Sequence, residues 1–224
     1  MEILENEDFY KMLMNLIKER RSVRIFTGRK IPREEIISII EAGIWAPTGC
    51  NNQELRFLII DKDEQLNEVL AFKPFLKGVS TIILVFCDMS LPMSHKIYIK
   101  NKWERHLPYI DTGLALGNMV LYAKSRGIDS CIINFSEFHM RYKKEDSIIK
   151  KIINRILLKL NLHSFLENNF EFYLRNILKL PKHYKILCGL ALGYAKVYPD
   201  VNVEKHGGKA IKREDVTHYI LSNY

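Results

Sequence analysis

The spacing of hydrophobic residues along the chain predicts six helices. Phe9, Leu13 and Ile17 recur at helical spacing within residues 6–20, which predicts an amphipathic helix there. A second helix should begin at Pro32, because proline fits the first helical position and acidic residues follow it. Further helices are predicted over residues 61–72, 108–126, 145–161 and 167–180.

Apolar runs between these helices predict four strands. The run from Val79 to Cys87 is typical of a strand buried on both faces. The other strands are predicted over residues 55–60, 128–135 and 184–194. Residues 47–52 form a turn-rich loop, and the polar segment 88–107 is expected to be a mobile loop or a lid. A short strand or helix is expected around residues 216–221.

A chain of 224 residues fits one domain, and we expect a single domain spanning residues 1–224. No internal repeat or low-complexity linker divides it. The helical pair within residues 136–179 is expected to be an insertion into this domain. The alternation of helices and strands by itself favours a wound α/β sheet.

Composition indicates a folded, water-soluble protein that carries no metal. Nearly half of the residues are apolar (47%), and no stretch of about 18 uncharged apolar residues predicts a membrane span. The acidic, polar N-terminus does not resemble a signal peptide, so a cytoplasmic location is expected. No two of the four cysteines have CxxC spacing. Three of them, Cys87, Cys131 and Cys188, stand in apolar runs and should be buried.

The net charge of +8 is concentrated in part of the chain. Residues 139–185 contain eleven Lys or Arg residues against four Asp or Glu residues. Such an excess suits nucleic acid, acidic lipid or a phosphorylated small molecule, and composition does not choose among them. A nucleic-acid-binding protein would use Lys150, Lys151, Arg155 and Lys159, although no zinc-finger or RNA-recognition signature accompanies them.

The densest cationic motif follows the first helix and consists of Arg20, Arg21, Ser22 and Arg24. In an extended segment alternate side chains share a face, so Ser22 and Arg24 should point to one place. The guanidinium group presents a planar fork of donors that matches phosphate oxygens. The segment is therefore either an anion clamp or a solvated basic turn.

Two further motifs carry polar groups in unusual surroundings. The loop Pro47 to Gln53 supplies a hydroxyl and several amides, which can read the mixed donors and acceptors of a heterocycle edge, or simply form a turn. Within helix 108–126, Gly113 and Gly117 permit close approach of another surface. Asn118 on that helix needs a polar partner, either a ligand or a backbone group.

Taken together and in order, these motifs resemble the nitroreductase family. The shared features are the Arg-Arg-Ser-x-Arg segment, the stretch Glu41 to Gln53 followed by a strand, and a Gly-x-Ala-x-x-Asn pattern over residues 113–118. The Leu180-Pro181 element and the last core strand, residues 190–194, match as well.

The resemblance implies residue roles in binding FMN. Arg20, Arg21, Ser22 and Arg24 would grip the phosphate and ribityl chain, and a C-terminal lysine, Lys209 or else Lys212, would complete the phosphate site. The loop residues that would lie against the flavin, usually that of the partner subunit, are Pro47, Thr48, Gly49 and Asn51. Asn118 and Asn134 are carried over as further cofactor-binding residues. No catalytic side chain is implied, because the isoalloxazine does the redox chemistry.

The resemblance also implies fold, activity and assembly. The fold would be α+β, a mostly antiparallel central sheet flanked by helices, with the helical pair inserted. The activity would be ping-pong hydride transfer from NADH or NADPH through FMN to a small organic acceptor such as a nitroaromatic or a quinone. The protein would be a homodimer with FMN at its interface and no membrane partner.

Two departures from the family pattern bear on the substrate. The family loop continues Gln-Pro-Trp, whereas Gln53 is followed here by Glu54 and Leu55. The basic insertion is either a surface or dimer embellishment, or a cap that selects an anionic or large acceptor. Enzymes on the same scaffold that oxidise azolines, remove halogens or destroy flavin remain alternatives, as does a flavin-free scaffold.

Overall fold

The computed structural model describes residues 7–94, 96, 106–135 and 169–199, together with positions 148, 149, 152, 153, 156 and 160. Its main sheet has the strand order β2-β3-β5-β4, and every neighbouring pair is antiparallel. The strands span Leu55–Ile60 (β2), Thr81–Asp88 (β3), Asp129–Ile133 (β4) and Tyr184–Gly193 (β5). All eight residues of β3 are buried, as the apolar run predicted.

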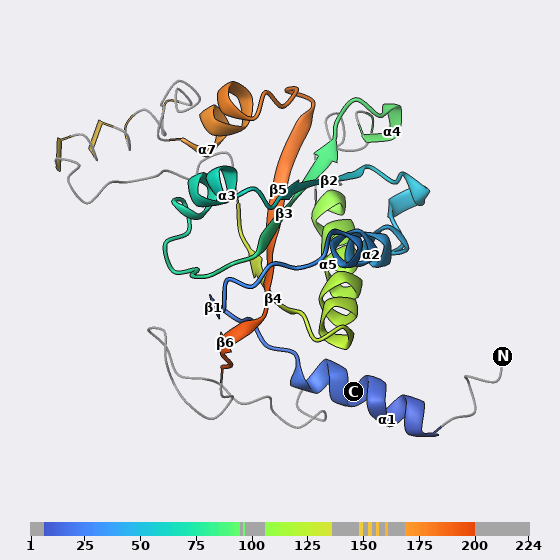
Figure 1. Cartoon of the computed structure of the whole chain (residues 1–224). Helices are drawn as coiled ribbons and strands as arrows, with labels where there is room; N and C mark the ends of the chain where they lie inside the picture. The colour runs from blue at the N-terminus through green and yellow to red at the C-terminus, as the bar shows by residue number, and fades with distance from the viewer. Residues whose placement is uncertain are drawn as a thin grey trace, which may run out of the picture.

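Helices cover both faces of this sheet (Figure 1). On one face lie α2 (Arg33–Ile44) and α5 (Leu107–Ser125), and on the other lie α3 (Asp63–Leu70) and α7 (Phe170–Phe172). Because α2 and α5 cross closely, Gly43 has no room for a side chain: a Cβ there would stand 2.8 Å from Met119. The α+β fold with a mostly antiparallel sheet is therefore confirmed.

A wound α/β sheet, which periodicity alone favoured, is wrong. Segments that alternate between helix and strand look the same in sequence whether the strands pair parallel or antiparallel, because pairing depends on residues far apart in the chain. Parallel contacts among the described residues are limited to two single bridges, Ser22 with Ser130 and Ile25 with Lys77.

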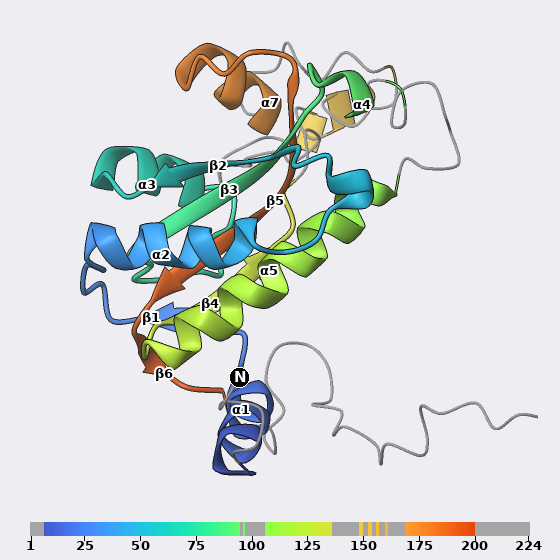
Figure 2. The same cartoon turned by 90° about the vertical axis from the view of Figure 1, so that its right-hand side faces the viewer.

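Helix α1 (Glu7–Glu19) lies at one end of the molecule, where it has no buried residue (Figure 2). A small sheet that the sequence did not predict connects this end with the core. It pairs β1 (Ile25–Phe26) antiparallel with β6 (Ala195–Val197). Strands of two and three residues are too short to show a hydrophobic period, which explains why the pattern missed them.

The last part of the insertion belongs to the core. The helix expected over residues 167–180 is realised as α7 and the π-helical turn η6 (Tyr173–Ile177). Phe170 and Leu174 are fully buried, and the Phe170 ring stacks on Phe135 with centroids 4.6 Å apart. In the helix expected over 145–161, the described positions 148, 149, 152, 153 and 156 are helical; its basic residues lie outside the described residues.

Two shorter predictions have mixed outcomes. The segment 88–107, expected to be irregular, contains the short helix α4 (Pro92–Ser94), and most of its remainder lies outside the described residues. Cys87, Cys131 and Cys188 are buried as predicted, and Cys50 is exposed. The element expected around residues 216–221 also lies outside the described residues.

Candidate functional site

The basic segment that follows α1 is extended and lies along the edge strand β4. The backbone N–H of Val23 donates to the carbonyl of Ser130 at 3.0 Å, and Ser22 bridges Ser130 in parallel. Val23 is fully buried, whereas Ser22 and Arg24 are half-buried, which is the alternation of an extended chain. The prediction that Ser22 and Arg24 share a face is therefore supported by the backbone.

Two of the three guanidinium groups stand near β4. Burial raises the pKa of the Cys131 thiol on that strand, and the positive charges of Arg24 and Arg20 act in the opposite direction. Coulombic influence of this kind requires both arginines to lie close to the strand. Both side chains are half-buried and retain access to solvent, so they form a cationic surface beside the end of the sheet.

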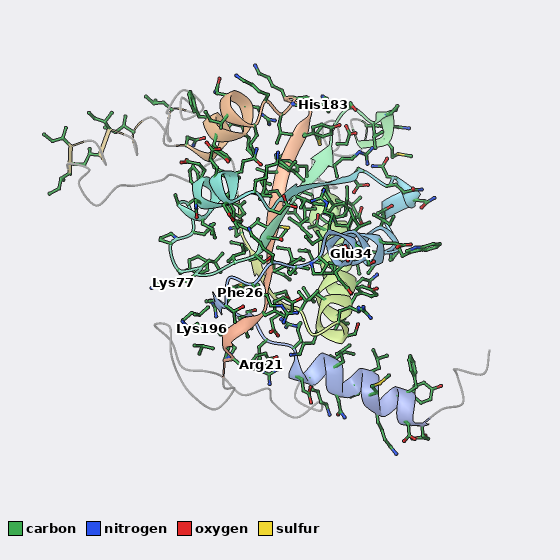
Figure 3. The ribbon with its side chains drawn as sticks, in the orientation of Figure 1. Arg21, Phe26, Glu34, Lys77, His183 and Lys196 are labelled. Atoms are coloured by element: carbon green, nitrogen blue, oxygen red, sulfur yellow. The ribbon has the colours of Figure 1, made fainter. Side chains whose placement is uncertain are left out.

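Arg21 points elsewhere. Its Nη1 donates to the carbonyl of Arg20 at 2.8 Å and to the carbonyl of Lys18, in the last turn of α1. Figure 3 shows it at the junction between α1 and the sheet. A cation at a helix C-terminus satisfies otherwise unpaired carbonyls and complements the helix dipole. Helix capping accounts for Arg21, and its role at a phosphate stays a prediction.

The outer face of β4 continues this surface with an apolar and a polar side chain. Ile133 and Phe135 point into the core, and the alternate residues Ile132 and Asn134 are exposed. Ser22 is in register with Ser130, but beyond Val23 the chain pairs elsewhere: the carbonyl of Arg24 accepts the backbone N–H of Lys77 at 3.0 Å. The structure thus places Ser22 beside β4 at Ser130, with Arg20 and Arg24 two positions away along the chain, whereas Asn134 lies four positions beyond Ser130.

The amide-rich loop after α2 adopts a strained turn. Within the turn η2 (Gly49–Asn51) and just after it, Cys50, Asn51 and Gln53 have φ values of 52°, 53° and 50°. Residues other than glycine rarely occupy this left-handed region, and such strain persists where the surroundings enforce it. Thr48 is the first restraint, since its Oγ1 accepts the backbone N–H of Gln53 at 3.1 Å.

The loop is fastened to the N-terminal part of α5, as Figure 2 shows. The buried carboxylate of Asp111 accepts the backbone N–H of Gly49 at 3.1 and 3.2 Å. Pro47 and Asn51 remain exposed. These two predicted residues are therefore presented at the surface by a loop that the helix restrains.

The loop and the basic segment lie at opposite ends of α5. Tyr198 donates its hydroxyl to the carbonyl of Glu19, next to Arg20, and the Lys124 ammonium stands 4.5 Å from the Tyr198 ring centroid. Lys124 and Asp111 are about 20 Å apart along the helix axis, at 1.5 Å per residue. Within one chain, the two predicted halves of the site do not meet.

The structure does not place the three remaining predicted residues, Asn118, Lys209 and Lys212, in a cofactor site. Asn118 lies on an exposed face of α5, and its Nδ2 donates to the carbonyl of Ala42 in α2 at 3.2 Å. The backbone partner explains this polar residue without a ligand, and its place in a cofactor site stays a prediction. Lys209 and Lys212 lie outside the described residues.

Sequence reasoning missed a charged cluster at the base of the loop. It consists of Glu54, Arg56 and Asp88, with the Arg56 Nη2 3.2 Å from the Asp88 Oδ2. Burial raises the pKa of Asp88, but hydrogen bonds from Ser90 and the charges of Arg56 and His183 outweigh it and hold that pKa below its usual value. The sequence did offer a signal for this cluster: where the family loop continues Gln-Pro-Trp, this chain has the charged residues Glu54 and Arg56 after Gln53.

The described residues contain no group of three or more His, Cys, Asp or Glu side chains arranged to hold a metal ion. None of the helices in the described part of the chain has the length and apolarity needed to cross a bilayer.

The sequence matches the model of the nitroreductase family over residues 17–73 and 64–194. A protein of Archaeoglobus fulgidus, provisionally named NADH dehydrogenase/NAD(P)H nitroreductase, is 30% identical over 120 residues, 52% of this chain and 64% of its own. An iodotyrosine deiodinase of Thermotoga neapolitana is 27% identical over 148 residues, 54% of this chain and 72% of its own. The matched region thus spans less than two thirds of the archaeal relative.

Solved structures share the fold. A provisionally named nitroreductase from Desulfovibrio desulfuricans, solved in complex with FMN, has a TM-score of 0.60 and 24% sequence identity. The superposition covers 95% of this chain and 96% of that protein.

Proposed function

The chain belongs to the nitroreductase family, and from this premise we propose that it is an FMN-dependent oxidoreductase that takes electrons from NADH or NADPH and delivers them to a small organic acceptor. Bound FMN supplies the hydride chemistry, so the protein's task is to bind, orient and shield the cofactor. The observation that carries the proposal is the extended segment Arg20–Arg24 beside β4, with its cationic side chains accessible.

The donor set of this segment fits a ribityl phosphate. Arg20 and Arg24 offer planar guanidinium donors to phosphate oxygens, and the Ser22 hydroxyl adds a neutral donor between them. Because both arginines are half-buried, water screens their charge less than on an open surface. Lys209 completes this site in our proposal, and Arg21 contributes through the position of α1.

The exposed face of β4 fits the planar ring. Ile132 is 47% exposed, which is unusual for an isoleucine on a strand, and Asn134 provides both a donor and an acceptor beside it. An apolar side chain can lie against an aromatic ring while the amide binds its polar edge. In this proposal the phosphate binds at the basic segment, and the ring extends along β4 towards Ile132 and Asn134.

The second side of the ring requires another copy of the chain. Pro47, Thr48, Gly49 and Asn51 stand at the far end of α5 from Arg20, too distant to complete the same site. We therefore propose a homodimer in which the loop of one subunit lies against the FMN of the other. In this arrangement Asn118 lies in or near the interface.

The surface of α5 and α2 supports this assembly. Ile110 and Leu114 on α5 are 49% and 44% exposed, and Trp45 after α2 is 80% exposed. A Cβ added at Gly113 or Gly117 would meet no atom within 4 Å. Exposed apolar residues beside such open glycines suit a partner helix at close range.

The acceptor is proposed at the level of its class. We propose a nitroaromatic or a quinone as the acceptor; the name of the nitroreductase relative supports the nitro compound, and that of the deiodinase relative makes reductive dehalogenation a second candidate. Both chemistries need a reduced flavin and a site that excludes water.

The experiment is to purify the protein and examine its colour and oligomeric state. We expect a yellow protein that releases FMN on denaturation and whose absorbance near 450 nm bleaches with NADH or NADPH. Reoxidation should then be compared for a nitroaromatic, a quinone and a halogenated phenol. A colourless protein that takes up no added FMN would refute the proposal, and a shift of nucleic acid by such a protein would favour the DNA- or RNA-binding alternative.

A further inference from the structure

The two charged residues Glu54 and Arg56, which follow the strained loop, direct their hydrogen bonds back to it. The Asn52 Nδ2 donates to the Glu54 Oε2 at 3.0 Å. The Arg56 Nη1 donates to the carbonyl of Gln53 at 2.9 Å. Each charge therefore contacts a residue within or beside the segment that carries the positive φ angles.

Glu54 and Arg56 are both held by contacts besides those to the loop. Glu54 is fully buried, and its carbonyl accepts the backbone N–H of Asp88 at 2.9 Å. Arg56 also contacts the buried carboxylate of Asp88. Asp88 is the last residue of β3, an inner strand of the sheet. The contacts of Glu54 and Arg56 with Asp88 therefore connect the loop to the core.

The strain in the loop explains why the contacts of Glu54 and Arg56 are needed. Left-handed backbone is sterically unfavourable for residues other than glycine, and Cys50, Asn51 and Gln53 all adopt it. An unrestrained segment would relax to ordinary turns. Asp111 holds the loop at Gly49, on its first half, and Glu54 and Arg56 hold its second half.

We infer that Glu54 and Arg56 are positioning residues that hold the loop containing Thr48, Gly49 and Asn51 in its strained conformation, and that they thereby set how tightly the loop binds flavin. The inference rests on the proposed function for the identity of the ligand. Neither residue needs to contact FMN, because both act through Asn52 and Gln53. Where the family has Pro-Trp after the glutamine, this chain thus has residues that hold the loop by hydrogen bonds, Glu54 and Arg56.

The test compares Glu54→Ala and Arg56→Met with two controls. Glu54→Gln keeps an oxygen that can accept from Asn52, so it should restore most of what Glu54→Ala loses. Arg33→Met removes an arginine whose ion pair with Asp61 lies elsewhere on the surface. Arg56 is 43% exposed, so its substitution leaves the core intact even if Glu54→Ala folds poorly.

Two measurements separate the positioning role from the ligand. In the FMN-free proteins, amide hydrogen exchange of a peptide spanning residues 48–55 should be at least about fivefold faster in Glu54→Ala and Arg56→Met than in wild type. With FMN, the dissociation constant should rise about tenfold, and the flavin absorbance spectrum should change shape. Glu54→Gln and Arg33→Met should stay within about threefold of wild type in both measurements.

The outcomes are distinguishable. Unchanged exchange of the 48–55 peptide in Arg56→Met and in folded Glu54→Ala would overturn the inference, whatever FMN does. Faster exchange together with an unchanged FMN dissociation constant would overturn the inference that Glu54 and Arg56 affect the affinity for FMN. Failure of the wild-type protein to bind FMN would instead refute the proposed function.

Discussion

The carboxylate of Asp111 accepts the backbone N–H of Gly49 with both oxygens, at 3.1 and 3.2 Å, and so joins the loop after α2 to the helix α5. Asp111 is 2% exposed, so this bond forms away from water. The contact fixes the start of a loop that contributes four of the predicted flavin-binding residues. Because the loop is bonded near the start of α5 and the arginine segment lies near its end, the length of the helix sets the distance between them.

Replacing Asp111 with alanine should loosen the loop and destabilise the protein. The half-buried backbone N–H of Gly49 would lose its acceptor, which costs roughly 1–3 kcal/mol. Urea denaturation should report that loss, and the FMN dissociation constant should rise about tenfold. Asp111→Asn retains an acceptor oxygen and should recover at least half of both effects. Equal stability of Asp111→Ala and wild type would show that the bond does not restrain the loop.

The double substitution Arg20→Ala, Arg24→Ala should release FMN. Each charge-assisted hydrogen bond to phosphate contributes roughly 1.5–3 kcal/mol, so the dissociation constant should rise at least about 100-fold. Flavin fluorescence titration measures it. Arg33→Ala, which removes an exposed arginine in an ion pair with Asp61, is the control for loss of a surface arginine elsewhere and should bind FMN normally. Undiminished flavin content in the double variant would remove these arginines from the site.

The dimer should depend on the exposed face of α5. Leu114→Glu places a charge at a side chain that is 44% exposed in the single chain, so the subunit should fold normally. If a second copy covers this face, burying the charge will dissociate the dimer and reduce FMN binding. Light scattering after size exclusion measures the mass. Ile177→Glu, at a side chain 58% exposed on η6, is the control and should leave the mass unchanged. A monomeric wild type would contradict the dimer directly.

Lys73 should make stability depend on pH in the alkaline range. It is 7% exposed, and burial lowers its pKa from 10.5 to about 8. The folded state therefore disfavours the ammonium form, and this penalty is fully present below about pH 8. As pH rises from about 8 towards 10.5, the folded protein has lost that proton while the unfolded chain still binds it, so stability rises.

Lys73→Met retains the aliphatic chain and removes the penalty. At pH 7 it should be more stable than wild type by about 1–3 kcal/mol, and the difference should shrink to near zero by pH 10.5. Urea denaturation at pH 7, 9 and 10.5 gives this difference. A constant difference over that range would show that desolvation of the ammonium group does not control it.

Arg175 should be essential for the stability of the inserted segment. Its guanidinium group donates to the Glu171 carboxylate at 2.7 Å and to the carbonyls of Pro181 and Tyr184 at 2.6 and 3.0 Å. Arg175→Ala should cost about 1–3 kcal/mol, because a carboxylate and two carbonyl groups, most of them half-buried, lose their donor together. FMN affinity should remain unchanged in the folded variant. A loss below about 0.5 kcal/mol by urea denaturation would indicate that α7 is not part of the core.

The elements followed from local pattern, and their boundaries agreed to within a few residues. The Val79–Cys87 run became a buried strand, and the helix predicted over residues 108–126 became α5, because the pattern of apolar residues in a short window reflects burial. Strand order did not follow from pattern. The family resemblance predicted a mostly antiparallel sheet where periodicity alone favoured a wound one, and the order β2-β3-β5-β4 is given by the structure alone.

For the site, the sequence by itself determined which residue types were available: the arginines after α1, the amides after α2 and the small residues of α5. Only the tertiary structure decided that Arg21 caps a helix, that Asn118 bonds to Ala42, and that Glu54 and Arg56 support the loop. The physical reason is that a hydrogen bond depends on distance and direction between groups that may be 76 positions apart, as in Asn118 and Ala42. A residue's chemistry is local in sequence, but its partner is chosen by packing.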